Sequence, residues 1–513
     1  MPRRRFLVAY TLALASTGIV KGQGLDQQTP FPLSDQSHDR PSWSTLPISN
    51  PTKSFWIDTP GSNPLAREHH GIFERSTGPL CFGDEIDVCV IGSGITGISA
   101  VYHLQRFFGA QGDGQDERKV VVLEAREFCS GATGRNGGHL TRNPFNGYAT
   151  RERLYGQENA RKSYLLEDYV SSSITDLIYS HGWSDTVDLV NGGHITVFLD
   201  EEEERHALVD HQDAKEGGLK LKDVRFLDKQ MMQNAYGINH SGVFFPSYNL
   251  WPLKFVSNLY NLSASANPRV KVKLHTLTPV TAISSSHSSS SAPSNQDTRW
   301  IVSTPRGNLS CKTVLHATNA YSSFLLPQFS NRIIPTRGQM FVVRAKASLE
   351  RLKRHSWDAN QGYEYWFARP EGKDKHGKEY QPPLVLLGGG RDTAGPGLDQ
   401  YTMDDSVLNE RVSKTLKEFL PNLYAGTGLF EEGRDAEMEW TGIMGYTHKG
   451  APFVGPVEGL DGQYIAAGFT GHGMPRTYAA AEAVSGMIVA NLMGTEWKAP
   501  EWLPEHYLTN WRH

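Results

Sequence analysis

Residues 86–108 constrain the fold more than any other part of this sequence. The apolar, β-branched run IDVCVI at 86–91 predicts a buried strand, and the glycine-rich turn GSGITG follows it directly at 92–97. Apolar residues then recur at helical spacing from 98 to 108. Glycines between a strand and a helix let the backbone approach a pyrophosphate, which meets the free N–H groups and the positive end of the helix dipole.

A second strand and an acidic residue follow in the order that a dinucleotide-binding unit requires. The run KVVVL at 119–123 predicts a parallel strand that ends at Glu124. An acid at this point can accept hydrogen bonds from ribose hydroxyls, although the loop 109–118 places it farther than the usual ~20 residues beyond the glycines. A lone glycine turn also serves plain helix–strand packing, but the ordered set indicates dinucleotide binding. The acid argues against the 2′-phosphate of NADP.

A second glycine- and hydroxyl-rich segment, AREFCSGATGRNGGH at 125–139, favours FAD over NAD. Such a loop can wrap a long cofactor that continues past the pyrophosphate. The cofactor-binding residues predicted from these segments are Gly92, Gly94, Ile95, Thr96, Gly97, Glu124, Ala125, Arg126, Ser130, Thr133, Arg135, Asn136, Gly137 and Gly138.

The stretch SGATGRNGGHL resembles the D-amino-acid oxidase/sarcosine oxidase superfamily of FAD-dependent amine and amino-acid oxidoreductases, in particular its γ-glutamylputrescine-oxidase-like branch and related fungal members. Further motifs occur in the family's order between 83 and 495. They are TPV (278–280), TVLHATNAY (313–321), PTRGQ (335–339), WTGIMG (440–445), PFVG (452–455) and IAAGFTGHGM (465–474).

The resemblance implies that two of these motifs place residues beside the adenosine and that the last one lies at the flavin. The residues implied are Val280, Thr318, Gly468, Gly471, His472, Gly473 and Met474. An Ala-rich helix is predicted from 477 to 492, so N–H groups at the preceding turn and the helix dipole can stabilise negative charge on the flavin. These glycines can alternatively serve tight packing alone.

The catalytic candidates are chosen for orienting and desolvating a substrate, because the flavin carries the hard chemistry of amine oxidation. They are Tyr363, Tyr365, Trp440 and His472, with Trp366 and Met444 as further cage residues. The runs 363–367 and 385–391 predict two strands of a substrate-domain sheet, one face of which covers the flavin in the family. Alternation places Tyr363, Tyr365 and Phe367 on one face. The same aromatic residues can equally be core.

The sequence departs from sarcosine-oxidase-type members at three points. The family's substrate-carboxylate lysine corresponds to Pro475, which Arg476 follows; its oxygen-activating lysine would fall near Leu386; and the segment 440–447 lacks the flavin-linking cysteine. We therefore expect non-covalent FAD and an amine or polyamine-like substrate rather than a simple α-amino acid. Glu364 is a candidate partner for a distal ammonium.

Composition excludes several other classes of protein. The 51 Lys and Arg against 55 Asp and Glu leave a net charge of −4, without the basic excess of a nucleic-acid binder. Four cysteines without a CxxC pair predict neither a disulfide scaffold nor a metal site. Cys89 lies in a predicted buried strand, where a free thiol acts as a small hydrophobe. Up to two disulfides remain open.

The N-terminal region differs from the rest of the chain. Residues 1–22 combine a basic start, a short apolar run and small residues, which predicts a secretory signal peptide and an extracellular protein. An uncleaved anchor and an intracellular protein are the alternatives, and no stable membrane partner is expected. Residues 23–82 predict an extended arm, attached to the body through Phe55-Trp56-Ile57.

Together these observations predict an α/β flavoprotein with a discontinuous Rossmann-type FAD-binding domain and an α+β substrate domain on a mixed or antiparallel sheet. The expected reaction is oxidation of a C–N bond of a small-molecule amine to an imine that hydrolyses, with O2 reduced to H2O2. A dehydrogenase with another acceptor and a non-catalytic flavin-binding protein are the alternatives, and the oligomeric state stays open. The predicted boundaries are 83–147, 240–335 and 435–495 for the FAD domain, 148–239 and 336–434 for the substrate domain, and 496–513 for a C-terminal tail.

Overall fold

The computed structural model describes residues 44–66, 80, 85–110, 117–286, 300–370 and 382–511. The predicted signal peptide and most of the predicted arm lie outside these residues. Among the described residues, no helix has the length and apolar character needed to cross a membrane.

The first sheet has the order β17-β18-β11-β1-β2-β8, with β10 and β9 added beside β11. The strands from β8 to β18 run parallel, whereas β17, β10 and β9 pair antiparallel. This confirms the predicted parallel unit. The bounds are β1 (Ile86–Ile91), β2 (Arg118–Leu123), β8 (Val270–His275), β9 (Ala282–Ser285), β10 (Trp300–Thr304), β11 (Gly307–His316), β17 (Phe453–Pro456) and β18 (Gln463–Ala467).

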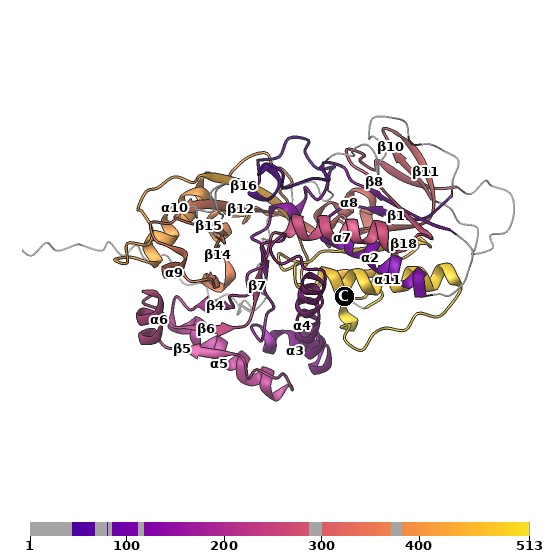
Figure 1. Ribbon diagram of the computed structural model, residues 1–513. Coiled ribbons are helices and arrows are strands. Elements are labelled where there is room, and N and C mark those ends of the chain that lie inside the picture. The colour runs from indigo at the N-terminus through magenta and orange to yellow at the C-terminus, as the bar shows by residue number, and fades with distance from the viewer. Residues whose placement is uncertain are drawn as a thin grey trace, which may run out of the picture.

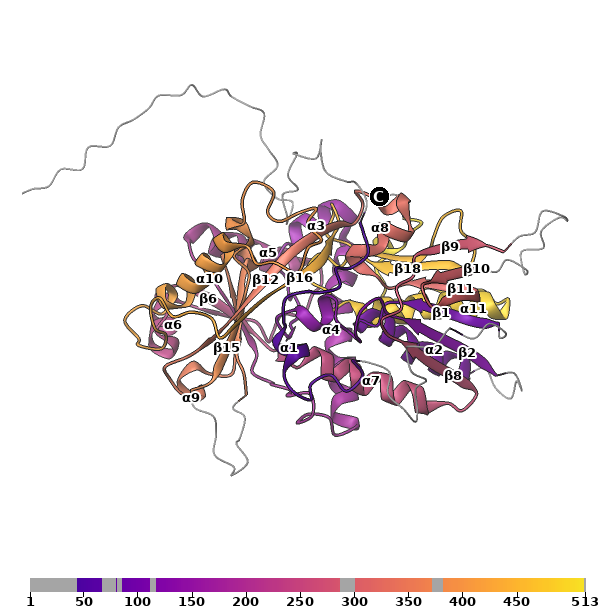
Figure 2. The same cartoon turned by 90° about the horizontal axis from the view of Figure 1, so that it is seen from above.

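The continuous apolar run of β1 arises because both faces of its sheet are covered. Val88 and Val90 pack into one core with α2 (Ile95–Ala110), α7 (Pro252–Ala266) and α11 (Thr477–Met493). Cys89 and Ile91 face a separate core on the other side, beneath β10. Figures 1 and 2 show α2, α7 and α11 together on one side of this sheet.

The second sheet has the order β16-β12-β15-β14-β13-β4-β6-β5 and is mixed, because only β13 and β4 pair in parallel. Its outer face packs on α10 (Glu410–Leu423), whereas its inner face joins the core of the first domain. Figure 1 shows this sheet and α10 on the left. The strand bounds are β4 (His194–Val197), β5 (Arg225–Leu227), β6 (Gly242–Phe245), β12 (Ile334–Arg344), β13 (Ser356–Ala359), β14 (Glu364–Ala368), β15 (Leu384–Gly388) and β16 (Met438–Tyr446).

The remaining elements connect the two sheets or cover their edges. They are α1 (Phe55–Asp58), β3 (His139–Leu140) paired with β7 (Tyr248–Asn249), α3 (Tyr148–Tyr155), α4 (Gln157–Ser180), α5 (Glu201–Glu216), α6 (Lys229–Tyr236), α8 (Ser322–Leu325) and α9 (Leu349–Leu352).

Three elements belong to a different domain from the one that the predicted boundaries assigned to them. β6 pairs with β4, and β16 pairs with β12, so both belong to the second sheet although 240–335 and 435–495 were assigned to the FAD domain. α4, assigned to the substrate domain, contributes Leu166 and Val170 to the core around α11. An apolar pattern predicts that a segment is buried, but not which sheet buries it.

The structure decides one disulfide that the sequence left open. Cys89 of β1 is bonded to Cys311 of the adjacent strand β11, at a Cα–Cα distance of 6.0 Å. Attachment of the arm at 55–57 is confirmed. Trp56 is fully buried, its indole N–H donates to the carbonyl of Asn136 at 2.5 Å, and Figure 2 shows α1 beside α7.

Candidate functional site

A single cavity of about 1500 Å³ runs between the two sheets. Its walls come from the glycine turn before α2, the loop 131–137, the segment 317–321, the turn before α11 and the inner face of the second sheet. Parallel sheets bind ligands at the carboxyl ends of their strands, and the end of β1 and the end of β2 open here.

The glycine turn shapes one end of the cavity. Gly92 has φ +108°, and a Cβ there would lie 2.7 Å from the carbonyl of Ala317. Gly94 lines the cavity opposite the hydroxyl of Thr133, which accepts a hydrogen bond from the N–H of Ile95 at 3.0 Å. Gly97 does not line it; a Cβ there would lie 2.0 Å from the carbonyl of Gly92, so this glycine permits α2 to pack close to the strand.

Glu124 is fixed at the end of β2 by three donors. One carboxylate oxygen accepts from the N–H and hydroxyl of Ser93 at 3.0 and 2.8 Å, and the other accepts from the N–H of Arg126 at 2.9 Å. The side chain lines the cavity and is almost fully buried. Its orientation suits acceptance of ribose hydroxyls, the role predicted for it.

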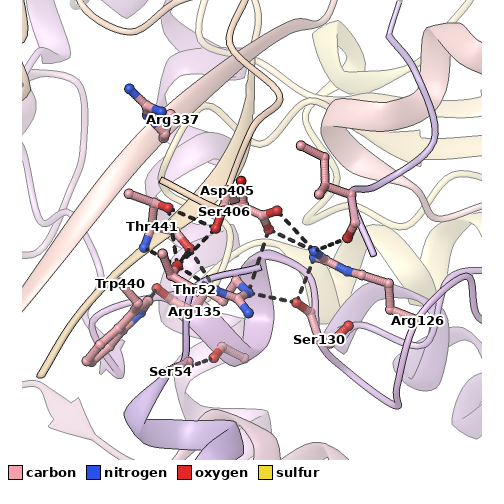
Figure 3. A network of polar contacts seen from close by, with 12 residues as sticks. Thr52, Ser54, Arg126, Ser130, Arg135, Arg337, Asp405, Ser406, Trp440 and Thr441 are labelled. Atoms are coloured by element: carbon pink, nitrogen blue, oxygen red, sulfur yellow. Dashed lines mark hydrogen bonds and ion pairs between the residues drawn. The ribbon is translucent and has the colours of Figure 1, made fainter. Parts of the chain in front are cut away.

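The guanidinium groups of Arg126 and Arg135 both meet the buried carboxylate of Asp405 (Figure 3). The shortest distances to its oxygens are 2.9 Å from Arg126 and 3.7 Å from Arg135. Both guanidiniums also donate to the carbonyl of Ser130, at 2.9 and 3.0 Å, and the N–H of Thr52 in the arm donates to the Asp405 carbonyl at 2.7 Å. Burial and the charge of Arg126 lower the pKa of Arg135 to about 10, although Asp405 opposes them.

The opposite end of the cavity is the turn before α11. Gly471 has φ +70°, and a Cβ there would lie 2.5 Å from the hydroxyl of Tyr446. Within the described part of the chain, the N–H groups of Gly471, Gly473 and Met474 donate to no protein acceptor. They line the cavity immediately before the α11 N-terminus, so they can stabilise negative charge on a ligand.

His472, on this turn, is held by a carboxylate from α4. Its Nε2 donates to Glu167 at 2.9 Å, and Nε of Arg476 donates to the other oxygen of Glu167 at 2.8 Å. Glu167 is fully buried and also accepts from the N–H of Asn143 at 2.6 Å. Burial alone would raise the pKa of Glu167, but the charges of His472 and Arg476 outweigh it and hold that pKa well below its ordinary value.

The inner face of the second sheet forms the remaining wall. Directly opposed residues on five neighbouring strands give the row Met340, Gly388, Tyr365, Asp358 and Thr196. Side chains opposed in register point to the same face of a sheet. Four of the five, all except Gly388, line the cavity.

Aromatic rings enclose the cavity where this wall approaches the cofactor loop. A Cβ at Gly137 would lie 2.5 Å from the ring of Tyr365, so the glycine allows the ring to close over the loop. The guanidinium of Arg391 lies 5.5 Å from the ring centre of Tyr363 and 4.7 Å from that of Tyr446. Burial raises the pKa of Tyr365, so its hydroxyl stays protonated at neutral pH.

The predicted site residues divide by position. Those that line the cavity are Gly92, Gly94, Ile95, Thr96, Glu124, Ala125, Arg126, Thr133, Arg135, Asn136, Gly137, Val280, Thr318, Tyr363, Tyr365, Met444, Gly471, His472, Gly473 and Met474. Those outside its lining are Gly97, Ser130, Gly138, Trp366, Trp440 and Gly468.

Two aromatic candidates and Glu364 are not positioned to touch a substrate. Trp440 is fully buried, and its indole N–H donates to the carbonyl of Arg135 at 2.8 Å, so it supports the cofactor loop. Trp366 and Glu364 alternate with Tyr365 on β14 and therefore face away from the cavity. Glu364 is thus not the partner of a distal ammonium. No pattern in the sequence pointed to Asp405 or Glu167, which reach the site from distant segments.

The donors and walls fit FAD. The acid at the end of the second strand suits the adenosine ribose, the helix N-terminus after the glycine turn suits the pyrophosphate, and the second helix N-terminus suits the flavin. Ribose, pyrophosphate and flavin follow one another in this order along FAD.

Comparison with known proteins supports this assignment. The family model "FAD dependent oxidoreductase" (DAO) matches residues 87–487. Gamma-glutamylputrescine oxidoreductase of Escherichia coli (strain K12) is 24% identical over 434 residues, which cover 79% of this chain and 83% of that protein. The probable oxidoreductase OrdL of Rhizobium meliloti (strain 1021) is 23% identical over 412 residues, covering 78% and 82%.

Solved structures share the fold. Glycine oxidase from Geobacillus kaustophilus superposes with a TM-score of 0.58 at 17% identity, covering 84% of this chain and 100% of that one. L-proline dehydrogenase from P. horikoshii gives a TM-score of 0.58 at 18% identity, with coverage of 83% and 97%.

Proposed function

This chain belongs to the DAO family of FAD-dependent oxidoreductases, and from that premise we propose that it oxidises a C–N bond of a small-molecule amine. One observation carries the proposal: the dinucleotide end of the cavity is continuous with a chamber walled by the rings of Tyr363, Tyr365 and Tyr446. Such a chamber suits an uncharged amine, because aromatic walls exclude water and orient a small substrate.

FAD supplies the hydride acceptor when it is bound. The chain's own residues bind and orient around it. The N–H groups of Gly471, Gly473 and Met474 hold negative charge at the end of the cavity next to α11. Glu167 fixes the ring of His472 through Nε2, so that the imidazole keeps one orientation beside the substrate.

His139, which also lines the cavity, adds no positive charge to it. Burial, reinforced by His194, lowers the pKa of His139 to about 4, so its ring is neutral at pH 7 and does not repel an ammonium arriving from solvent. The imine product hydrolyses in water to a carbonyl compound and an amine or ammonia.

We propose O2 as the electron acceptor, which yields H2O2. A dehydrogenase is the second candidate, because Leu386, near the position of the family's oxygen-activating lysine, is fully buried and apolar. The deciding experiment mixes the FAD-loaded protein anaerobically with a panel of amines, follows loss of the oxidised-flavin absorbance, and then admits O2 while H2O2 is assayed. Bleaching followed by H2O2 supports the oxidase, bleaching without it supports the dehydrogenase, and no bleaching by any amine contradicts the proposal.

Tyr365→Phe tests the role of the chamber. The hydroxyl donates to the sulfur of Met340 at 3.4 Å, and its loss should leave FAD bound while lowering the rate of anaerobic reduction roughly tenfold. Tyr464→Phe is the matched control, since Tyr464 is buried in the first sheet and outside the cavity. Equal rates of flavin reduction in the two variants would show that the Tyr365 hydroxyl has no role in the reaction.

We also propose that the protein is secreted through its first 22 residues. The Cys89–Cys311 disulfide supports this, because disulfides form and persist mainly in oxidising compartments. Mass spectrometry of the protein from culture medium should find an N-terminus near residue 23. Recovery of the intact chain only from cytosol, with both thiols free, would contradict secretion.

A further inference from the structure

We infer that the outer part of the cavity is a binding subsite for a second cationic group of the substrate, formed by Asp358 and Glu203 with His194 and Thr196. The inference rests on the proposed amine oxidation and narrows its substrate class to amines that carry a second positive charge, as alkyl diamines do.

The register of the second sheet places this subsite at a defined separation from the aromatic chamber. Asp358 lies directly opposite Tyr365, and Thr196 lies directly opposite Asp358 on the next strand. Neighbouring strands are about 4.8 Å apart, so these side chains stand roughly 5 and 10 Å along the wall from Tyr365. A short alkyl chain with one amine beside Tyr365 would bring its other end to Asp358.

Glu203 approaches the same place from the first turn of α5. Its side chain is half-buried, lines the cavity and accepts a hydrogen bond from the N–H of Leu199 at 2.7 Å. Burial, with the negative charges of Asp200 and Asp358, raises the pKa of Glu203. Both carboxylates line the cavity, and two carboxylates in one cavity favour the arrival of a cation.

No basic side chain compensates these carboxylates. Among the described residues, neither Asp358 nor Glu203 forms an ion pair with a lysine or arginine, and the one ion-pair contact of Asp358 is with Nε2 of His194 at 3.5 Å. Arg142 also lines the cavity, but it is already paired with Asp168 at 3.2 Å and with Asp223.

Buried polar atoms without partners provide a second, independent observation. His194 is 2% exposed and Thr196 is 7% exposed, and both line the cavity. The hydroxyl of Thr196 forms no hydrogen bond in the described structure, and neither do Nε2 of His194 and Oδ1 of Asp358, which share only the 3.5 Å ion-pair contact named above. Buried polar atoms are normally hydrogen-bonded, so the free Thr196 hydroxyl beside the long His194–Asp358 contact indicates a ligand that supplies donors.

An ammonium group matches these atoms. It has three donors and no acceptor. Nδ1 of His194 lies 2.8 Å from the hydroxyl of Ser356, and in the tautomer in which Nδ1 is the donor, Nε2 is an acceptor, as are Thr196 and Asp358. A metal ion is a poorer match, because no group of three His, Cys, Asp or Glu residues in the described chain has an arrangement that could hold one.

The test compares 1-aminobutane with 1,4-diaminobutane on the FAD-loaded enzyme. The wild type should show a kcat/KM at least about tenfold higher for the diamine, since hydrogen bonds to a charged group are worth that much or more. Asp358→Asn and Glu203→Gln should each lower the diamine-to-monoamine ratio about tenfold. Asp392→Asn and Glu201→Gln remove equivalent charges from exposed positions outside the cavity and should keep the wild-type ratio.

The outcomes separate this inference from the proposed function. If the ratio of kcat/KM for the diamine to that for the monoamine agrees within about twofold among the wild type, Asp358→Asn and Glu203→Gln, the proposed subsite is wrong. If neither amine reduces the flavin, amine oxidation fails, and equilibrium dialysis with 1,4-diaminobutane then decides the subsite: binding that is lost in Asp358→Asn supports it, and absent binding overturns it. If Asp358→Asn does not retain FAD, Glu203→Gln takes its place in both assays, with the same results supporting or overturning the subsite.

Discussion

Replacement of Asp405 by asparagine should destabilise the protein far more than a typical Asp→Asn exchange. The carboxylate is fully buried between Arg126 and Arg135, whose side chains are also nearly inaccessible, at 7% and 2%. Asparagine keeps the shape and one acceptor oxygen, but it removes the only carboxylate that forms an ion pair with these two guanidiniums in the described chain. Two buried positive charges would then face each other.

The expected magnitude follows from that arrangement. Removal of one member of a buried ion pair costs about 3–5 kcal/mol, and because asparagine retains one hydrogen bond to Arg126 we expect about 3 kcal/mol. One kcal/mol moves the melting temperature by ~2–4 °C in domains of 150–250 residues and by less in larger ones, so Tm should fall by about 5 °C.

Thermal unfolding of the FAD-free protein, followed by circular dichroism, measures this effect. Asp404→Asn is the matched control, because Asp404 is adjacent and more exposed, and its hydrogen bonds from Ser406 survive as bonds to an amide oxygen. A Tm for Asp405→Asn within about 1 °C of the wild type would refute the argument that this carboxylate holds Arg126 and Arg135 in place.

Three further outcomes are expected. Gly97→Ala should abolish FAD retention, because its Cβ would lie 2.0 Å from the carbonyl of Gly92; normal flavin absorbance after gel filtration would contradict this. Burial raises the pKa of Glu364 to about 7, so the folded state holds a proton that the unfolded state loses near pH ~4.3, and stability falls as pH rises between these values. Glu364→Gln should therefore raise Tm more at pH 8 than at pH 5. An equal increase in Tm at both pH values would contradict the raised pKa of Glu364. Glu167→Gln should retain FAD but lower kcat about tenfold through a misoriented His472, while an unchanged kcat and pH profile would make the contact merely structural.

Local patterns were sufficient for the parts of the molecule in which neighbours in sequence are neighbours in space. The strand at 86–91, the helix after it and the strand at 118–123 follow from apolar periodicity and glycine placement, and all three are confirmed. The glycine turn and Glu124 lie within this unit, so their places around one cavity were also predictable. The helix at 477–493 and the two strands β14 and β15 follow from the same kind of signal, whereas the antiparallel pairing of the two strands comes from the structure.

Residues that act through distant partners gave no such signal. Asp405 meets Arg126 across 279 positions of sequence, and Glu167 meets His472 across 305, in segments with no recognisable motif. Strand alternation places Tyr365 and Glu364 on opposite faces of β14. It does not show which of the two faces lines the cavity and which packs on the outer core, and only the structure shows that Tyr365 lines the cavity.

The sequence by itself determined that this chain builds a dinucleotide site on a parallel sheet, because a glycine turn and a helix N-terminus bind phosphate through local backbone geometry. Only the tertiary structure decided which charges surround the substrate. The register of β4, β13 and β14 brings Asp358 and Thr196 into line with Tyr365, and strand register depends on hydrogen bonds between segments far apart in the chain. A charge acts through distance in space, and the folded sheets set that distance.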